Sequence, residues 1–479
     1  MNAHSLNRDD KAEPVMQRPI TPDWLNELAG FCARLRYDDL PEAVVARTLQ
    51  VIADCVAAIA AGAQEPEVIA LAGRMTPIDQ PAGAAIIGAG RSGAAAQAAF
   101  LNGTAGTMLE LDEGNQFARG HPGIHVVPAV LAAAGRTRAS GRDVIAAVAL
   151  GYEIGARIGI ASKLRITMHP HGTWGTIGAA VAIAWLNRRD AAAMIETINV
   201  ASSLGLSTSR RTMLEGGTVR NSFAGFSNQI GLMVDDLVAA GFTGEADGLG
   251  TVYGTVIAES WQPGLMVEVL GQRWEIARNY FKRHACCRYN HGALDALARI
   301  VAAEGGRIAP ETIARIDVAT YVWAAQLAGQ EPHNMLAAKF SLPFSIATTI
   351  VHGAATVEAF RESARLEPVI RDLARRVFVR EDADATAKLP ALRPATVSVS
   401  LTDGRVLQAQ ALTNRGDAED PYSPTEIREK FFDLATPVWG EPHAAAILAA
   451  IDALPQAGDL AALDRLLAAA PNATNGRSS

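Results

Sequence analysis

The sequence is poor in aromatic residues and rich in small ones. Only 6% of its 479 residues are aromatic, whereas 49% are hydrophobic and 42 are glycines. Because small side chains let helices pack at short interaxial distances, this composition favours an extensive helical bundle over an aromatic-rich β-sandwich. A chain of this length and apolar content is able to bury a large core, and we expect it to form two domains.

Cysteines are also scarce. The chain has four, Cys32, Cys55, Cys286 and Cys287, and no two of them form a Cys-x-x-Cys pair. Neither a structural zinc site nor a disulfide framework is indicated, and no other spacing of Cys and His suggests a metal. We therefore expect a metal-independent protein from a reducing compartment, the cytoplasm.

The sequence has no long basic run, no apolar leader and no obvious membrane span. Its net charge is −7, which argues against nucleic acid as a partner and means that an anionic ligand needs a local basic pocket. Residues 1–20 mix acids and bases without the apolar core of a signal peptide, so we expect a disordered tail. The uncharged run at residues 174–187 is too short to cross a bilayer, so no membrane partner is expected.

A glycine-rich motif at residues 88–93, Gly-Ala-Gly-Arg-Ser-Gly, matches the G-x-G-x-x-G pattern of dinucleotide-binding folds. The apolar stretch before it is short, and the following helix does not lead to a second strand that ends in an acid. A Rossmann unit requires both features. We interpret the motif as a glycine turn and expect no dinucleotide cofactor.

Two histidines stand at the entrance of an uncharged helix. His169 and His171 lie in the stretch 168–176, and the Ala- and Gly-rich run that follows offers no polar face to water. Other helices must wrap this run, so its entrance is expected to face an interior cleft, with a cap at Thr173 or Thr176. A lone histidine is more often structural than catalytic, so the functional interpretation depends on polar residues elsewhere.

Three further segments supply those polar residues. After a helix expected over residues 94–109, three acids and two histidines fall within sixteen residues, among them Glu110, Asp112 and His121. Charge runs usually face water, but the apolar flanks predict that this loop is pinned between buried elements. Arg220 follows two glycines and precedes a helix, from where it could clamp a carboxylate or simply lie at the surface.

The densest polar cluster opens a helix at residues 282–291, and it contains Lys282, Arg288 and His291. Cations at a helix N-terminus, where backbone N–H groups lack partners, predict a site for anionic groups. From here the pattern is mixed, with a strand candidate at residues 313–321 and a helix candidate at residues 337–352.

A hairpin candidate at residues 396–411 completes this mixed region before Ala-rich helices return. We therefore predict a mainly α protein. A large all-helical domain comprises residues 21–280 and 412–470, and a smaller α+β domain, residues 281–411, is inserted into it.

The chain resembles the MmgE/PrpD family, which includes methylcitrate dehydratases and cis-aconitate decarboxylases, from about residue 22 to 465. The resemblance implies a helical domain built from both chain ends, a smaller α+β domain, an active site at their junction, a homodimer and no cofactor. The motifs that carry it are Asn-Gly-Thr-Ala at 102–105 with His121-Pro122, His169-Pro170 with Gly-Thr-Ile-Gly-Ala-Ala at 175–180, Cys-Cys-Arg-Tyr at 286–289, and Ala-Lys-Phe-Ser-Leu-Pro-Phe at 338–344.

The resemblance also implies roles for single residues. The family usually has Asp where this chain has Glu110, a hydroxyl residue at Gly114 and Lys at Arg220, so the pocket is reshaped. The predicted catalytic residues are His121, His169, Lys282 and Glu110, and the predicted substrate-binding residues are Arg220, Asp112, His171, Arg288 and His291.

The implied chemistry is abstraction of a proton next to a carboxylate, which gives an aci-carboxylate. Lys282 and Arg220 would stabilise its charge, and His169 or His121 would act as base or acid. The leading hypothesis is a cofactor-free lyase that dehydrates a di- or tricarboxylate such as 2-methylcitrate. The alternatives are decarboxylation of a cis-aconitate-like acid, epimerisation of an iminodisuccinate-like acid, and a non-catalytic polycarboxylate-binding protein.

Overall fold

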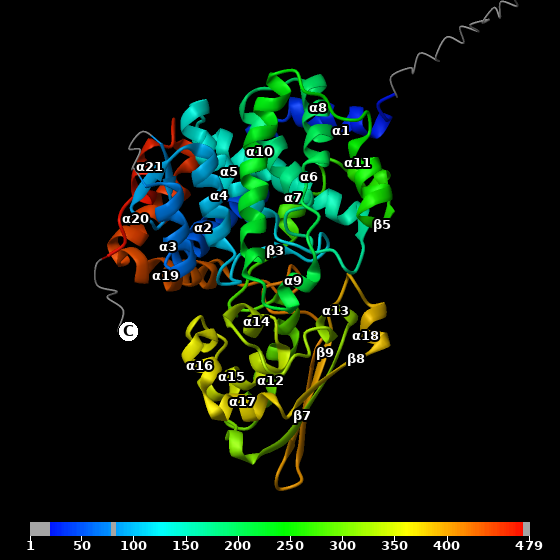
Figure 1. Ribbon diagram of the computed structural model, residues 1–479, viewed down its shortest axis with the longest axis vertical. Helices are drawn as coiled ribbons and strands as arrows, with labels where there is room; N and C mark the ends of the chain where they lie inside the picture. The colour runs from blue at the N-terminus through cyan, green and yellow to red at the C-terminus, as the bar shows by residue number, and fades with distance from the viewer. Residues whose placement is uncertain (1–19, 78–82, 473–479) are drawn as a thin grey trace, which may run out of the picture.

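The computed structural model describes residues 20–77 and 83–472. The predicted tails, residues 1–20 and the residues after Pro471, lie almost entirely outside the described residues. Figure 1 shows helices from both ends of the chain gathered in one part of the molecule and the largest sheet in the other. The predicted mainly α class with a smaller α+β part is confirmed.

The helix α7 (Trp174–Leu186) is buried along its whole length. Its backbone lies very close to that of α6, since a Cβ atom added to Gly151 would come within 2.7 Å of the Gly178 carbonyl oxygen. Small residues are therefore required where the two helices cross, as the composition predicts. The helices that pack around α7 are α5 (Pro122–Thr137), α6 (Gly141–Ala161), α8 (Ala191–Ser203) and α10 (Phe223–Ala239).

The two ends of the chain pack on each other. Helix α19 (Pro424–Trp439) lies against α2 (Glu42–Gly62), near α4 (Ala95–Gly106) (Figure 1). The Ser423 hydroxyl accepts a hydrogen bond from the Glu426 N–H at 3.2 Å and caps α19, which stabilises a helix by about 1 kcal/mol. The other helices of this part are α1 (Asp23–Arg34), α3 (Pro66–Met75), α9 (Arg210–Leu214), α11 (Gly248–Thr251), α20 (Glu441–Asp452) and α21 (Ala461–Leu467).

Two helices, α2 and α6, are long and apolar enough to cross a membrane by length and composition alone. Each has 21 residues, and their mean hydropathies are 1.7 and 1.6. However, 67% and 94% of their apolar windows are buried inside the protein, as expected for core helices of a globular domain. The sequence prediction, which considered only an uncharged run, did not single out these two helices.

The largest sheet has the strand order β10-β9-β7-β8. Strand β7 pairs in parallel with β8, and β9 is antiparallel to both of its neighbours. The predicted hairpin forms between β9 and β10, and α12 packs against both strands. The bounds are β7 (Ile313–Thr320), β8 (Val377–Glu381), β9 (Ala395–Leu401), β10 (Val406–Ala411), α12 (Arg288–Ala303), α13 (Val322–Ala325), α16 (Glu362–Leu366), α17 (Pro368–Ala374) and α18 (Ala383–Ala387).

One predicted helix in this part is divided into two. The expected element at residues 337–352 forms α14 (Met335–Lys339) and α15 (Leu342–His352). Ser341 lies between them and accepts a hydrogen bond from the Phe344 N–H at 3.0 Å, so it caps α15. The sheet and these helices fall within residues 288–411, while the predicted boundaries at 280/281 and 411/412 stay a prediction.

The glycine-rich motif joins two short antiparallel strands, β1 (Ala84–Ile86) and β2 (Arg91–Gly93). Gly88 and Gly90 adopt positive φ angles of 75° and 66° in the turn between them. A dinucleotide fingerprint instead connects a strand to a helix. The interpretation as a turn is therefore confirmed.

Candidate active site

A short strand pair brings the acidic loop to the start of the α+β part. Strand β3 (Gly114–Asn115) is antiparallel to β6 (Asn279–Tyr280), with Gly114 opposite Tyr280. A Cβ atom on Gly114 would lie 2.4 Å from the Tyr280 hydroxyl oxygen. Only glycine fits here, and a tyrosine hydroxyl stands where the resemblance implies a hydroxyl side chain. The pairing places Lys282 two residues from the strand, beside the acids.

Glu110 occupies the centre of the site. Its backbone has the left-handed φ of 55°, which is strained for a residue with a side chain, and the side chain is buried. Arg220 contacts Glu110 Oε1, and Lys282 Nζ lies 3.8 Å from Glu110 Oε2. Arg220 and Lys282 therefore meet at one carboxylate, but Arg220 lines the cavity whereas the fully buried Lys282 does not.

Little space is left beside Glu110. The cavity that Glu110 and Arg220 line has a volume of about 40 Å³, which is room for only a few water molecules. The reason is that Glu110 itself neutralises the cations that were expected to need an external anion.

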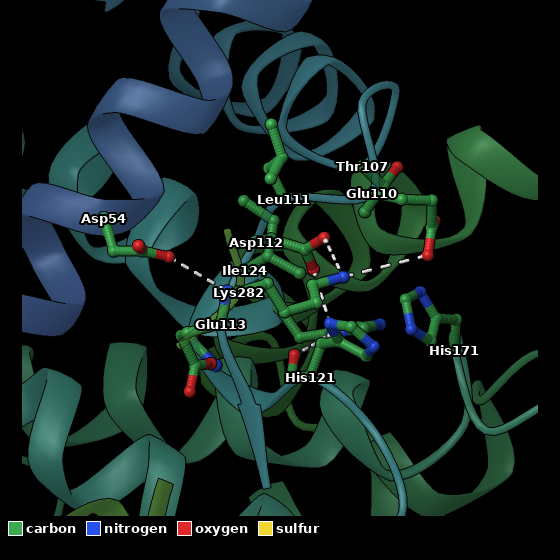
Figure 2. A network of polar contacts seen from close by, with 12 residues as sticks. Asp54, Thr107, Glu110, Leu111, Asp112, Glu113, His121, Ile124, His171 and Lys282 are labelled. Carbon is green, nitrogen blue, oxygen red and sulfur yellow. Dashed lines mark hydrogen bonds and ion pairs between the residues drawn. The ribbon is translucent and has the colours of Figure 1, made fainter. Parts of the chain in front are cut away.

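Asp112 connects the second cation to a histidine. Its Oδ2 lies 2.8 Å from His121 Nδ1, and its Oδ1 lies 3.6 Å from Lys282 Nζ. Figure 2 shows Lys282 between Glu110 and Asp112, with His121 and His171 close by. Burial acts to raise the pKa of Asp112, but the nearby His121 and Lys282 outweigh it and hold that pKa well below its usual range. Asp112 therefore stays ionised and fixes His121 through Nδ1, which leaves Nε2 available to a ligand.

The other two predicted histidines are neutral. Burial, followed by the charge of Arg220, lowers the pKa values of His169 and His171 well below the usual value. His169 Nδ1 accepts a hydrogen bond from the His171 backbone N–H at 3.1 Å. Its neutral ring therefore carries the proton on Nε2 and is a donor there.

Thr173 is the N-cap residue of α7, as predicted, but its side chain makes no capping hydrogen bond. Thr173 occupies the position before the helix, but its hydroxyl donates to the Pro170 carbonyl oxygen at 2.6 Å. Thr176 lies inside the helix, and its hydroxyl donates to the Gly172 carbonyl oxygen at 3.2 Å. The two hydroxyls therefore fix the histidine loop rather than the first turn.

Arg288 lines the cavity, although its charge is already balanced. Its Nη2 lies 2.6 Å from Asp417 Oδ1, and its guanidinium stacks 4.5 Å from the centre of the Tyr280 ring. The predicted anion site at the start of α12 is therefore not free: an acid from another loop compensates its first cation.

His291 is not brought into the cavity. Its ring lies between Arg288 Nη1, at 2.9 Å from Nδ1, and the Cys286 carbonyl oxygen, at 3.3 Å from Nε2. It also contacts the His284 ring edge to face. His291 lies about one helical turn after Arg288 and does not line the cavity, so its role in substrate binding stays a prediction.

Several cavity residues were missed from the sequence. Arg119 adjoins the polar stretch that the sequence singled out, and its place between Asp112 and His121 was a usable signal. Tyr289 ends the Cys-Cys-Arg-Tyr motif beside Arg288, which was also a usable signal, whereas Arg210, Tyr280 and Arg393 lie outside the motifs that the sequence analysis singled out. The missed lining residues are Arg119, Arg210, Tyr280, Tyr289 and Arg393.

Together these features define a class of site: a buried, cation-rich cavity with neutral histidines and an Asp–His pair, suited to a small anion that exchanges a proton. Within residues 20–77 and 83–472, no group of three or more His, Cys, Asp or Glu side chains could hold a metal ion.

The chain belongs to the MmgE/PrpD family. The family's N-terminal domain model matches residues 26–259, and its C-terminal domain model matches residues 284–456.

Its relatives include enzymes that match nearly the whole chain. The cis-aconitate decarboxylase of Aspergillus terreus is 25% identical, covering 92% of this chain and 95% of the relative. The cis-aconitate decarboxylase-like protein oryM of Aspergillus oryzae is 23% identical over 86% and 90% of the two chains. The mouse cis-aconitate decarboxylase is 23% identical over 77% and 78%.

Proposed function

We propose that this protein is a lyase that decarboxylates a cis-aconitate-like tricarboxylate. The observation that carries the proposal is the arrangement of Lys282 and Arg220 on the two oxygens of Glu110, beside His121 and Asp112. A substrate carboxylate that replaces the Glu110 carboxylate would be held by two cations next to a proton donor. The names of the relatives favour decarboxylation over dehydration of 2-methylcitrate, which was the leading hypothesis from the sequence.

The chemistry explains why two cations are needed. Cis-aconitate carries a carboxymethyl group on a carbon–carbon double bond. When carbon dioxide leaves from this group, its bonding electrons form a new double bond, and the electrons of the old one move onto the conjugated carboxylate. This aci-carboxylate carries one more negative charge than the original carboxylate. Preorganised donors such as Lys282 and Arg220 typically stabilise such charge by about 3–4 kcal/mol each.

A proton must then be delivered to the carbon next to the aci-carboxylate. His121 is the proposed donor, because Asp112 holds its Nδ1 and leaves Nε2 for the substrate. His169 presents an N–H at Nε2 and is proposed to orient the substrate from the opposite loop. The product is an unsaturated dicarboxylate with a terminal methylene group.

Product analysis in D₂O tests the proposal. Cis-aconitate, 2-methylcitrate and iminodisuccinate are incubated separately with the protein and followed by mass spectrometry and NMR, with carbon dioxide measured in parallel. We expect one carbon dioxide per cis-aconitate and one deuterium in the product, both lost in His121→Asn. Loss of water from 2-methylcitrate without carbon dioxide would replace decarboxylation by dehydration. Deuterium exchange into iminodisuccinate without net conversion would indicate an epimerase, and binding without turnover would indicate a binding protein.

A further inference from the structure

Three arginines gather around Tyr289 on a part of the cavity wall that the mechanism does not use. The guanidiniums of Arg393 and Arg210 each lie 5.9 Å from the centre of the Tyr289 ring. Arg119 lines the same cavity. Within the described residues, no carboxylate lies at ion-pair distance from any of these three arginines, unlike Arg220 and Arg288.

Arg393 is the most deeply buried of the three arginines. It is only 2% exposed, and its Nε and Nη1 atoms are buried without a hydrogen-bond partner in the described chain. Its guanidinium stacks on the ring of Tyr280 at 5.6 Å, which holds it at the cavity wall. A buried guanidinium whose donors lack acceptors is strongly disfavoured unless an anion meets it.

The other two arginines add charge to the same place. Arg210 has an unpartnered Nε and only a 3.5 Å contact from Nη1 to Gln326. Arg119 donates to the carbonyl oxygens of Gly159 and Ser162 and is fixed by them. Burial, together with the charges of Arg210 and Arg393, lowers the pKa of Arg119, as expected for like charges held close together.

We propose that Arg393, Arg210 and Arg119 form a second anion subsite, which binds a substrate carboxylate remote from the reacting carbon. This inference rests on the proposed function, in which Lys282 and Arg220 hold the carboxylate that receives the charge. Two separate cationic subsites in one cavity select a tricarboxylate over a dicarboxylate, because only the former can fill both and still carry the carboxylate that leaves. The Arg393 subsite therefore sets the substrate class.

Binding of two unreactive acids tests the subsite without relying on turnover. Calorimetry with tricarballylate, a saturated tricarboxylate, and with succinate is carried out on the native protein, Arg393→Gln, Arg393→Lys and Arg210→Gln. Arg315→Gln, on the exposed face of β7, is the matched control. We expect Arg393→Gln to weaken tricarballylate by about 10- to 100-fold, the scale of a charged hydrogen bond, and to change succinate little. Arg393→Lys should recover part of the loss.

The outcomes separate the subsite from a structural role. Equal weakening of both acids, or no weakening of either, would overturn the proposal. If Arg393→Gln does not fold, Arg210→Gln carries the test, since the Arg210 side chain loses only a long hydrogen bond to Gln326 and a distant contact with the Tyr289 ring. A protein that fails to decarboxylate cis-aconitate but shows the selective loss of tricarballylate would refute the proposed function and leave the subsite standing.

Discussion

Two buried charge networks lie on opposite sides of the loop at residues 107–113 (Figure 2). In the first, Lys430 Nζ lies 2.5 Å from Asp54 Oδ1 and donates to the Leu111 carbonyl oxygen at 2.6 Å. Asp54 Oδ2 accepts from the Glu113 N–H at 2.9 Å. This network therefore holds the backbone at Leu111 and Glu113, the two neighbours of Asp112.

The second network contains Glu110, Asp112, Arg220 and Lys282. Its charges are balanced by ion pairs, yet Glu110 Oε1, Asp112 Oδ1 and Lys282 Nζ are buried without a hydrogen bond among the described residues. Fully hydrogen-bonded networks rigidify a fold, whereas buried polar atoms without hydrogen bonds need a separate explanation. We therefore propose that the Lys430 network supports the fold and that the Lys282 network serves the proposed reaction.

The largest expected effect comes from breaking the support network. Lys430→Met leaves Asp54 buried without its cation and should lower the free energy of unfolding by about 3–5 kcal/mol, measured by urea denaturation. Arg428→Met, on the same helix but in a largely exposed pair with Asp452, should cost about 1 kcal/mol or less. Equal losses for the two variants would contradict the comparison.

In the Lys282 network, a substitution should impair catalysis more than stability. Lys282→Met should lower kcat by about 10²–10³-fold, because the lysine stabilises charge that develops only in the transition state. Its melting temperature should fall less than that of Lys430→Met, since Arg220 and His121 still compensate the two acids. Steady-state kinetics measures the loss of kcat, and thermal melting measures the loss of stability. A folded variant with native kcat would show that Lys282 only supports the fold.

A buried histidine on α5, His125, gives a pH dependence. His125 Nδ1 lies 2.7 Å from the His121 carbonyl oxygen, and its Nε2 accepts from the Gly172 N–H at 3.3 Å. Burial lowers its pKa from 6.5 to about 4. Because the unfolded state then binds the proton more tightly, the stability is fully present above pH 6.5. It should fall by about 1.4 kcal/mol per pH unit as the pH drops toward 4.

Urea denaturation between pH 4 and 7 measures this slope. His125→Gln keeps hydrogen-bonding capacity at this position but cannot titrate, so its profile should be flatter than that of the native protein. Parallel profiles would show that other groups cause the acid sensitivity.

The smallest effect is expected for Arg220→Lys. Lysine keeps the positive charge beside Glu110 but loses the guanidinium contacts to Thr107 and Asn221, which are long at 3.5 and 3.4 Å. We expect kcat/KM to fall by no more than about 10-fold, which is the scale of one weak hydrogen bond. A larger loss would show that the planar guanidinium itself orients the substrate.

Local signals explain what the sequence predicted well. The hairpin predicted at residues 396–411 forms between β9 and β10, two strands that follow each other directly in the chain. The acids and cations of the site were found because they cluster in short stretches. By contrast, Lys430 lies 376 residues from Asp54, and Arg393 lies outside every motif. Such contacts depend on how distant segments pack, and the spacing of residues in the sequence does not indicate that packing.

Helix orientation explains why Arg288 lines the cavity and His291 does not. A cation-rich helix start shows that polar groups gather there, but only packing decides which turn faces the opening. Arg288 lines the cavity, and Asp417 balances its charge. The His291 ring instead lies between Arg288 and the Cys286 carbonyl oxygen.

In the proposed function, the contact between Glu110 and Arg220 makes the protein's own carboxylate a competitor of the substrate. A tethered group acts at an effective concentration on the order of millimolar, so a monocarboxylate such as acetate gains little by displacing Glu110. A ligand with several carboxylates engages further cations at once and benefits from multivalency. The buried glutamate would thereby favour binding of polycarboxylates over monocarboxylates.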